Sequence, residues 1–235
     1  MTNLSDTAPG ADAPSNSADW RFFLPISAGS NVLLVTNHGE DIARYFEKLG
    51  IRTTIYNNDS STGPDVEFTK QKSADFENEF SPPGGHSLFD VVAIPHGLPE
   101  YLLSRGETPQ IDVYQKIKQA LNPRGALLIG FSNSLRLGRA ARPFVNFYAT
   151  PQGMIGLLRK AGYPSVEIYG AIPDLNVPDY IFSLNKHEIG FVLEHRYRYK
   201  IPAWVLKLLT TSFVAGSLSG FFPFYYAVAY PDILK

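Results

Sequence analysis

The chain has 235 residues, of which 44% are hydrophobic and 18% are charged, a composition typical of one globular, soluble domain with a substantial core. It contains no cysteine, which excludes disulfide scaffolds, thiolate metal sites and cysteine nucleophiles. The net charge of −1 gives no overall attraction to nucleic acid, so none is expected as a partner. Residues 1–135 carry a net charge of −6 and residues 136–235 one of +5. The basic half could meet an anionic substrate or a lipid surface, although scattered solvated charge explains it more simply.

The first 19 residues, "MTNLSDTAPGADAPSNSAD", are rich in small and polar residues and show no apolar periodicity. Such a segment cannot bury enough surface to order itself, so we expect 1–19 to be a disordered N-terminal tail. It has neither the basic start nor the apolar run of a signal peptide. With the absence of cysteine, this predicts a cytoplasmic protein. Residues 20–235 are expected to form a single domain, with 185–235 as its helical and strand-forming C-terminal part.

After the tail, short apolar runs alternate with helical patterns. Buried or β-branched strands are expected at 32–35, 53–56, 89–94, 126–131 and 166–169. Helices are expected between them, with apolar faces starting at Ile42, Tyr114 and Met154. Gly50 and "NPRG" are predicted to end the first two helices, and Thr150-Pro151 and Gly162 to bound the third. This alternation predicts an α/β fold with a mostly parallel sheet and helices on both faces.

The first predicted strand runs into a polar turn, Thr36, Asn37, His38 and Gly39. In open parallel sheets, ligands bind beyond the carboxyl ends of the strands, so this turn lies at the expected site. The turn lacks the G-x-G-x-x-G pattern of dinucleotide sites, and Glu40 and Asp41 follow it where a pyrophosphate would lie. No P-loop occurs elsewhere. NAD, FAD and ATP are therefore not expected.

Four segments in order resemble the class I S-adenosylmethionine-dependent methyltransferases. They are "VLLVTNHGEDIARYFEKLGIRTTIYNND", "FDVVAIPHGLPEYL", "ALNPRGALLIGFSNS" and "LLRKAGYPSVEIYG". The resemblance covers about residues 30 to 184. It implies a Rossmann-like methyltransferase fold, with a seven-stranded sheet whose last strand is reversed, and methyl transfer from S-adenosyl-L-methionine.

The resemblance also implies a set of cofactor-binding residues. The turn residues Thr36, Asn37, His38 and Gly39 would lie under the amino-acid end of the cofactor, Asn57 and Asp59 near its ribose, Asp75 at the adenine edge, and Pro95 after the fourth strand of the family. Three features depart from the family. Leu34 stands where an acid is usual in the first strand, and Asn57 stands near the position where an acid usually holds the ribose hydroxyls. The glycines that the family has in the turn fall on Thr36, His38 and Glu40, with Gly39 between them.

His96 follows a predicted strand and is the best candidate for a general base, because a histidine can titrate near neutral pH. A purely structural imidazole is the alternative. Asn133 and Tyr148 are candidate pocket-lining residues. His187 and His195 are expected on the surface of a helix that Asn185 and Glu188 cap. No His/Asp/Glu triple has ligand spacing, so no metal site is expected.

Residues 201–230 contain one charge, Lys207, and are long enough to span a bilayer. Polar residues, glycines and prolines interrupt the run. We therefore expect a helix covering the sheet, followed by a strand inserted at its edge from "FYYAVAY". Membrane contact through this stretch is possible but not favoured.

Two functions stay open from the sequence. The first is an enzyme that transfers a methyl group to a small-molecule, glycan or peptide acceptor in a biosynthetic pathway. The second is a catalytically inactive methyltransferase-like protein that serves as a binding or scaffold protein. One form of this hypothesis places the protein at the periphery of a membrane. Leu34, Thr36 and Asn57 favour the second, and the intact downstream segments favour the first.

Overall fold

The structure is a computed structural model of the whole chain. It describes residues 20–36, 40–56, 89–96, 110–133, 150–172, 175, 178–197, 204 and 222–232. The expected N-terminal tail, residues 1–19, lies outside this part, so the expectation of disorder stays a prediction.

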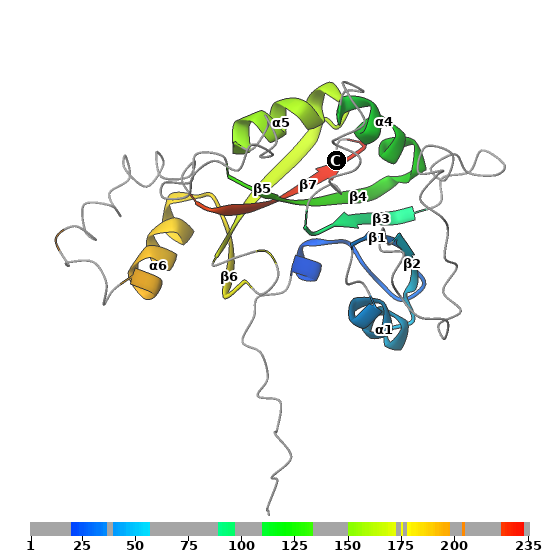
Figure 1. The fold of residues 1–235 in the computed structure, drawn as a ribbon, viewed down its shortest axis with the longest axis horizontal. Coiled ribbons are helices and arrows are strands. Elements are labelled where there is room, and N and C mark those ends of the chain that lie inside the picture. The colour runs from blue at the N-terminus through cyan, green and yellow to red at the C-terminus, as the bar shows by residue number, and fades with distance from the viewer. Residues whose placement is uncertain are drawn as a thin grey trace, which may run out of the picture.

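Seven strands form one sheet, in the order β2-β1-β3-β4-β7-β5-β6 (Figure 1). They are β1 (Asn31–Val35), β2 (Arg52–Tyr56), β3 (Phe89–Ile94), β4 (Leu121–Ser132), β5 (Ser165–Ile172), β6 (Tyr180–Ser183) and β7 (Phe224–Tyr230). Strands β1 to β4 pair in parallel, and β7 runs antiparallel to both β4 and β5. Strands β1 to β5 therefore share one direction, and β6 and β7 run opposite to them. The reversal of the last strand, β7, agrees with the fold that the resemblance implies.

Apolar side chains on the two faces of the sheet form two separate cores. On one face, α4 (Gln110–Ala120) and α5 (Pro151–Lys160) pack side chains such as Ile117 and Leu158 against the sheet, and α6 (Lys186–Tyr197) joins the same core. On the other face, α1 (Glu40–Lys48) and the 3₁₀ helix η1 (Trp20–Phe23) bury Phe46 and Trp20. Figure 1 shows α4 and α5 on the side of the sheet opposite to α1. The prediction of helices on both faces is confirmed.

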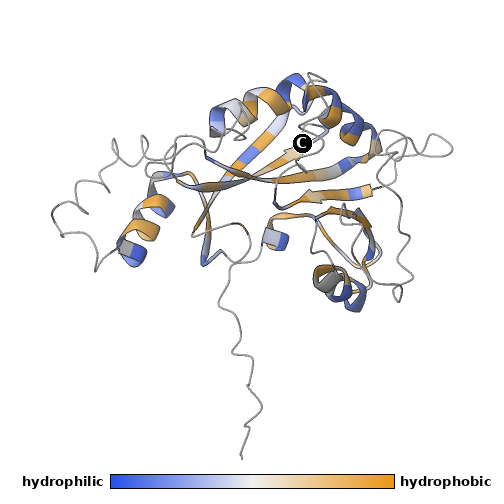
Figure 2. Ribbon diagram, in the orientation of Figure 1, coloured by the Kyte–Doolittle hydropathy of each residue, from blue (hydrophilic) through white to orange (hydrophobic). Residues whose placement is uncertain are grey.

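The alternation of side chains along each strand explains these two cores. In β1, Leu33 and Val35 belong to the α4–α5 core, whereas Val32 and Leu34 belong to the α1 core. A strand covered on both faces therefore reads as a continuous apolar run. In Figure 2 the strands are mostly hydrophobic, whereas α4 and α5 carry both hydrophobic and hydrophilic stretches, as helices lying on one face of a sheet do.

The signals expected at Thr150, Gly50 and Gly162 operate as predicted. The Thr150 side chain accepts a hydrogen bond from the Gly153 amide at 3.0 Å and caps α5. Gly50 and Gly162 follow α1 and α5 with φ of 72° and 94°, in the left-handed region that favours glycine.

Three details of the sequence prediction are wrong. Strand β6 comes from "YIFS" at the outer edge of the sheet, where no strand is expected from the sequence. Strand β7 lies between β4 and β5 instead of at an edge. "NPRG" lies inside β4, where the β3–β4 register shifts between Phe89 and Val91, because residues 122–125 bulge out of the pairing.

Of the apolar stretch 201–230, the structure describes Trp204 and residues 222–230, and there β7 is a buried central strand. The rest of the expected covering helix lies outside the described residues, so it stays a prediction. Within the described residues, no helix combines the length and apolar character needed to cross a bilayer. In the same part of the chain, no three His, Asp or Glu side chains lie close enough together to hold a metal ion.

Candidate functional site

The carboxyl ends of β1, β2 and β3 meet at one edge of the sheet. Val35 lies opposite Tyr56 in the β1–β2 pair, and Leu34 lies opposite Ala93 in the β1–β3 pair. The residues that follow these strands, Thr36 after β1 and Pro95 after β3, are therefore neighbours at this edge. The two turns therefore share one edge, as the parallel pairing of β1 and β3 requires.

Thr36 is held in place at the start of the first turn. Its amide donates a hydrogen bond to the Tyr56 carbonyl at 3.2 Å, which continues the β1–β2 ladder by one step. Its side chain is buried, with 5% of its surface exposed. Helix α1 begins four residues later, at Glu40, so its N-terminal amides lie near the same edge. This strand–turn–helix arrangement places backbone donors where a ligand of a parallel sheet binds.

Several predicted site residues lie outside the described part of the chain. They are Asn37, His38, Gly39, Asn57, Asp59 and Asp75, together with the candidate pocket residue Tyr148. Their roles stay predictions.

Leu34 occupies the β1 position at which the resembled family usually has an acid. Its side chain is fully buried and packs in the α1 core with residues such as Phe46. At this position the chain therefore offers no carboxylate. The described part of the site fits the cofactor through the arrangement of strand, turn and helix, and departs from the family pattern at Leu34 and at Thr36, which stands where a glycine is usual.

The turn after β3 holds the two residues predicted there in different environments. Pro95 is buried, whereas the side chain of His96 is exposed. The turn presses closely on β4: a Cβ atom built on Gly130 would lie 1.8 Å from the Pro95 carbonyl oxygen. Only glycine permits this approach, so Gly130 determines how close the His96 turn lies to the sheet.

Asn133 has a structural role at the end of β4. Its Nδ2 donates to the Phe222 carbonyl at 2.8 Å, and its backbone amide donates to the Pro223 carbonyl at 2.9 Å. The same Nδ2 lies 3.4 Å from the Tyr225 hydroxyl. Burial raises the pKa of Tyr225 far above its usual value, despite hydrogen bonds at Phe222 and Asn133, so the phenol stays neutral. Asn133 thus joins the end of β4 to the start of β7.

Three residues beside the His96 turn were missed from the sequence. They are Gly130, Leu175 in the connection between β5 and β6, and Tyr226 on β7. A glycine inside the otherwise apolar run "ALLIGF" was the one available signal, since glycine in a buried strand marks the close approach of another backbone. Nothing local marks Leu175 or Tyr226.

The surface histidines predicted on α6 are where they were expected. His187 and His195 are both exposed. His195 stacks on Phe191 with 3.9 Å between ring centroids, and its Nδ1 lies 2.8 Å from the Phe191 carbonyl. This pairing along one helix accounts for His195 without a ligand.

Comparisons with solved structures show the methyltransferase fold. A SAM-dependent methyltransferase from Archaeoglobus fulgidus is similar with a TM-score of 0.54 and 16% identity, over 89% of this chain and 90% of that one. The [4+2]-cyclase SpnF is similar with a TM-score of 0.51 and 14% identity, over 91% and 78%. Phosphoethanolamine N-methyltransferase 2 from Haemonchus contortus gives 0.51 and 12%, over 89% of this chain and 50% of that one. No family model and no curated protein sequence matches the chain.

Proposed function

We propose that this protein transfers a methyl group from S-adenosylmethionine to a small-molecule, glycan or peptide acceptor in a biosynthetic pathway. The observation that carries the proposal is the juxtaposition of two turns at one sheet edge, the Thr36 turn that leads into α1 and the turn of Pro95 and His96. One turn belongs to the expected cofactor site and the other bears a side chain able to act on an acceptor. We place the activity in the cytoplasm, in line with the absence of cysteine.

In this proposal the turn from Thr36 to Gly39 holds the amino-acid end of the cofactor, and the segment after β2, with Asn57 and Asp59, holds its ribose. Asp75 would meet the adenine edge, and Pro95 would lie against the cofactor from the neighbouring strand. Bound S-adenosylmethionine would supply an electrophilic methyl group.

His96 is the proposed general base. An exposed imidazole beside the cofactor turn can take a proton from an acceptor hydroxyl or amine, which makes that group a better nucleophile.

A second candidate function is a binding or scaffold protein with the same fold. Leu34 favours it, because a buried leucine replaces the family's acid in β1. The similarity to SpnF, which is described as a cyclase, also shows that this fold carries functions other than methyl transfer.

Calorimetric titration of the purified full-length chain with S-adenosylmethionine and with S-adenosylhomocysteine separates the two functions. Binding heat, with a melting temperature that rises with ligand concentration, is expected for the enzyme. The absence of both heat and thermal shift at millimolar ligand would exclude the enzyme and favour the scaffold.

A further inference from the structure

The turn that carries His96 lies close to residues of the sheet and of the β5–β6 connection that have no role in the proposed reaction. Gly130 of β4 lies at its centre. Its φ is not in the left-handed region, so the need for glycine here is steric. The carbonyl oxygen and carbon of Pro95 lie 1.8 and 2.7 Å from the position that a Cβ on Gly130 would take.

Leu175 packs over the same point of β4. Its Cδ1 lies 3.2 Å from that Cβ position, and the residue is 8% exposed. The Pro95 carbonyl and the Leu175 side chain therefore both lie close to the position that a Cβ on Gly130 would take. Leu175 belongs to the connection between β5 and β6, which is closed by a hydrogen bond from the Asp179 amide to the Ile172 carbonyl at 2.7 Å.

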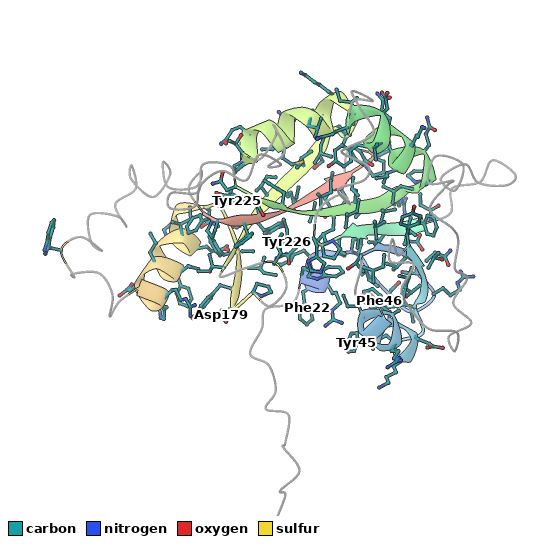
Figure 3. The ribbon with its side chains drawn as sticks, viewed as in Figure 1. Phe22, Tyr45, Phe46, Asp179, Tyr225 and Tyr226 are labelled. Carbon is teal, nitrogen blue, oxygen red and sulfur yellow. The ribbon has the colours of Figure 1, made fainter. Side chains whose placement is uncertain are left out.

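Tyr226 fixes the position of Leu175. It lies directly opposite Gly130 in the β4–β7 pair and is fully buried (Figure 3). Its hydroxyl donates to the Leu175 carbonyl at 2.8 Å. A buried carbonyl outside a helix or strand requires a partner, and losing that partner costs more than the bond itself contributes. The Tyr226 hydroxyl therefore binds the β5–β6 connection to a central strand of the sheet.

We propose that Tyr226 is a positioning residue for His96: its hydroxyl holds Leu175 over Gly130, and Leu175 in turn confines the Pro95 carbonyl and the His96 turn at the sheet edge. The catalytic consequence rests on the proposed function, whereas the positional consequence does not. Without the hydroxyl, the Leu175 segment loosens and the His96 turn gains freedom to shift away from β4.

The test replaces Tyr226 by phenylalanine, which keeps the ring and removes only the hydroxyl. Tyr163→Phe is the matched control, because Tyr163 is also fully buried and its hydroxyl donates to a backbone carbonyl, that of Tyr114, at 3.2 Å. Tyr163 follows α5 on the other face of the sheet, in the α4–α5 core.

The first readout is the NMR signal of the His96 imidazole in the free, full-length protein, assigned with a His96→Gln variant. Tyr226→Phe should shift or broaden this signal, while Tyr163→Phe should leave it unchanged, although both variants lose some stability. An unchanged signal in Tyr226→Phe, or equal changes in both variants, would overturn the proposal. This readout needs no cofactor, so it remains decisive even if methyl transfer is not the function.

The second readout is kinetic and applies once an acceptor has been found. A loosened base should lower kcat by about tenfold to a hundredfold, because misplacement of a reacting group by about 1 Å has an effect of this size. The KM for S-adenosylmethionine should change much less than kcat, since of the proposed cofactor residues only Pro95 lies in the turn that Leu175 confines. A change in this KM with kcat unchanged would assign Tyr226 to cofactor binding instead and would contradict the positioning role.

Discussion

The carboxylate of Asp90 accepts a hydrogen bond from the backbone amide of Asn31, with 2.8 Å between Oδ2 and N. The Asn122 side chain donates to the other carboxylate oxygen. Asp90 stands near the start of β3, between β1 and β4, so one side chain joins three strands at the amino edge of the sheet, opposite the candidate site.

Asp90→Ala should lower the free energy of unfolding by about 1–3 kcal/mol, because it leaves the Asn31 amide and the Asn122 side chain without their charged acceptor. Asp90→Asn should cost less, since an amide oxygen can still accept one of the two bonds. Urea denaturation measures both values. Equal costs for the two variants would show that the carboxylate does not act through these bonds.

Gly130 and Gly156 should respond in opposite ways to replacement by alanine. A Cβ on Gly130 would meet the Pro95 backbone, so Gly130→Ala should lower the free energy of unfolding by about 1–3 kcal/mol. A Cβ on Gly156, inside α5, meets no atom within 4 Å, so Gly156→Ala should raise it by about 0.5–1 kcal/mol. Chemical denaturation of the two variants gives the comparison. A Gly130→Ala protein as stable as the wild type would show that the His96 turn is not confined by β4.

The buried strands could be predicted because each is covered on both faces and reads as an apolar run. Helix α5 could be predicted because its Thr150 cap and terminal Gly162 act locally. The position of β7 could not be predicted, because its insertion between β4 and β5 depends on pairing with strands far away in the sequence. Strand β6 could not be predicted either, because it is short and follows two prolines, which are rare inside strands.

The candidate site also has a part that could be predicted from the sequence and a part that could not. The turns after β1 and β3 follow from the rule that ligands bind at the carboxyl ends of parallel strands, so Thr36 and His96 could be placed from the sequence. The contact of Gly130 with Pro95 and the bond from Tyr226 to Leu175 join residues distant in the sequence. The glycine inside "ALLIGF" indicates a close approach but not its partner, and no local pattern marks Tyr226 or Leu175.

The start of α6 provides a test by pH. Asn185 Oδ1 accepts bonds from the amides of His187 and Glu188, and Glu188 Oε2 accepts one from the Ser183 amide at 2.6 Å. Partial burial opposes ionisation of Glu188, but the hydrogen bonds from Ser183 and Asn185 outweigh it and hold its pKa below the usual 4.5. A lowered pKa means that Glu188 stabilises the fold above pH 4.5, and that this contribution is lost as the pH falls through the folded-state value.

NMR titration of the Glu188 carboxyl should give a pKa below 4.5 in the wild type, and a higher one in Asn185→Ala. Glu188→Gln should remove the corresponding part of the pH dependence of stability between this pKa and 4.5. A Glu188 pKa at or above its usual value would contradict the capping arrangement at Ser183 and Asn185.

The cofactor turn provides the test most directly linked to function. Gly39 is the single glycine in the turn between β1 and α1, and it alone there allows unusual dihedrals or close approach of a ligand. Gly39→Val should therefore abolish binding of S-adenosylmethionine and S-adenosylhomocysteine.

Asn57 follows β2, where the resembled family uses an acid to hold the ribose. A charged acceptor strengthens such a bond, so Asn57→Asp should tighten binding by about tenfold to a hundredfold, as expected for roughly 1.5–3 kcal/mol. Calorimetric titration of the two variants beside the wild type measures these changes, with Asp90→Asn as a control at the opposite edge whose affinity should not change. If Asn57→Asp binds no more tightly than the wild type, the ribose does not lie at the end of β2; if Gly39→Val binds normally, the cofactor does not lie over this turn.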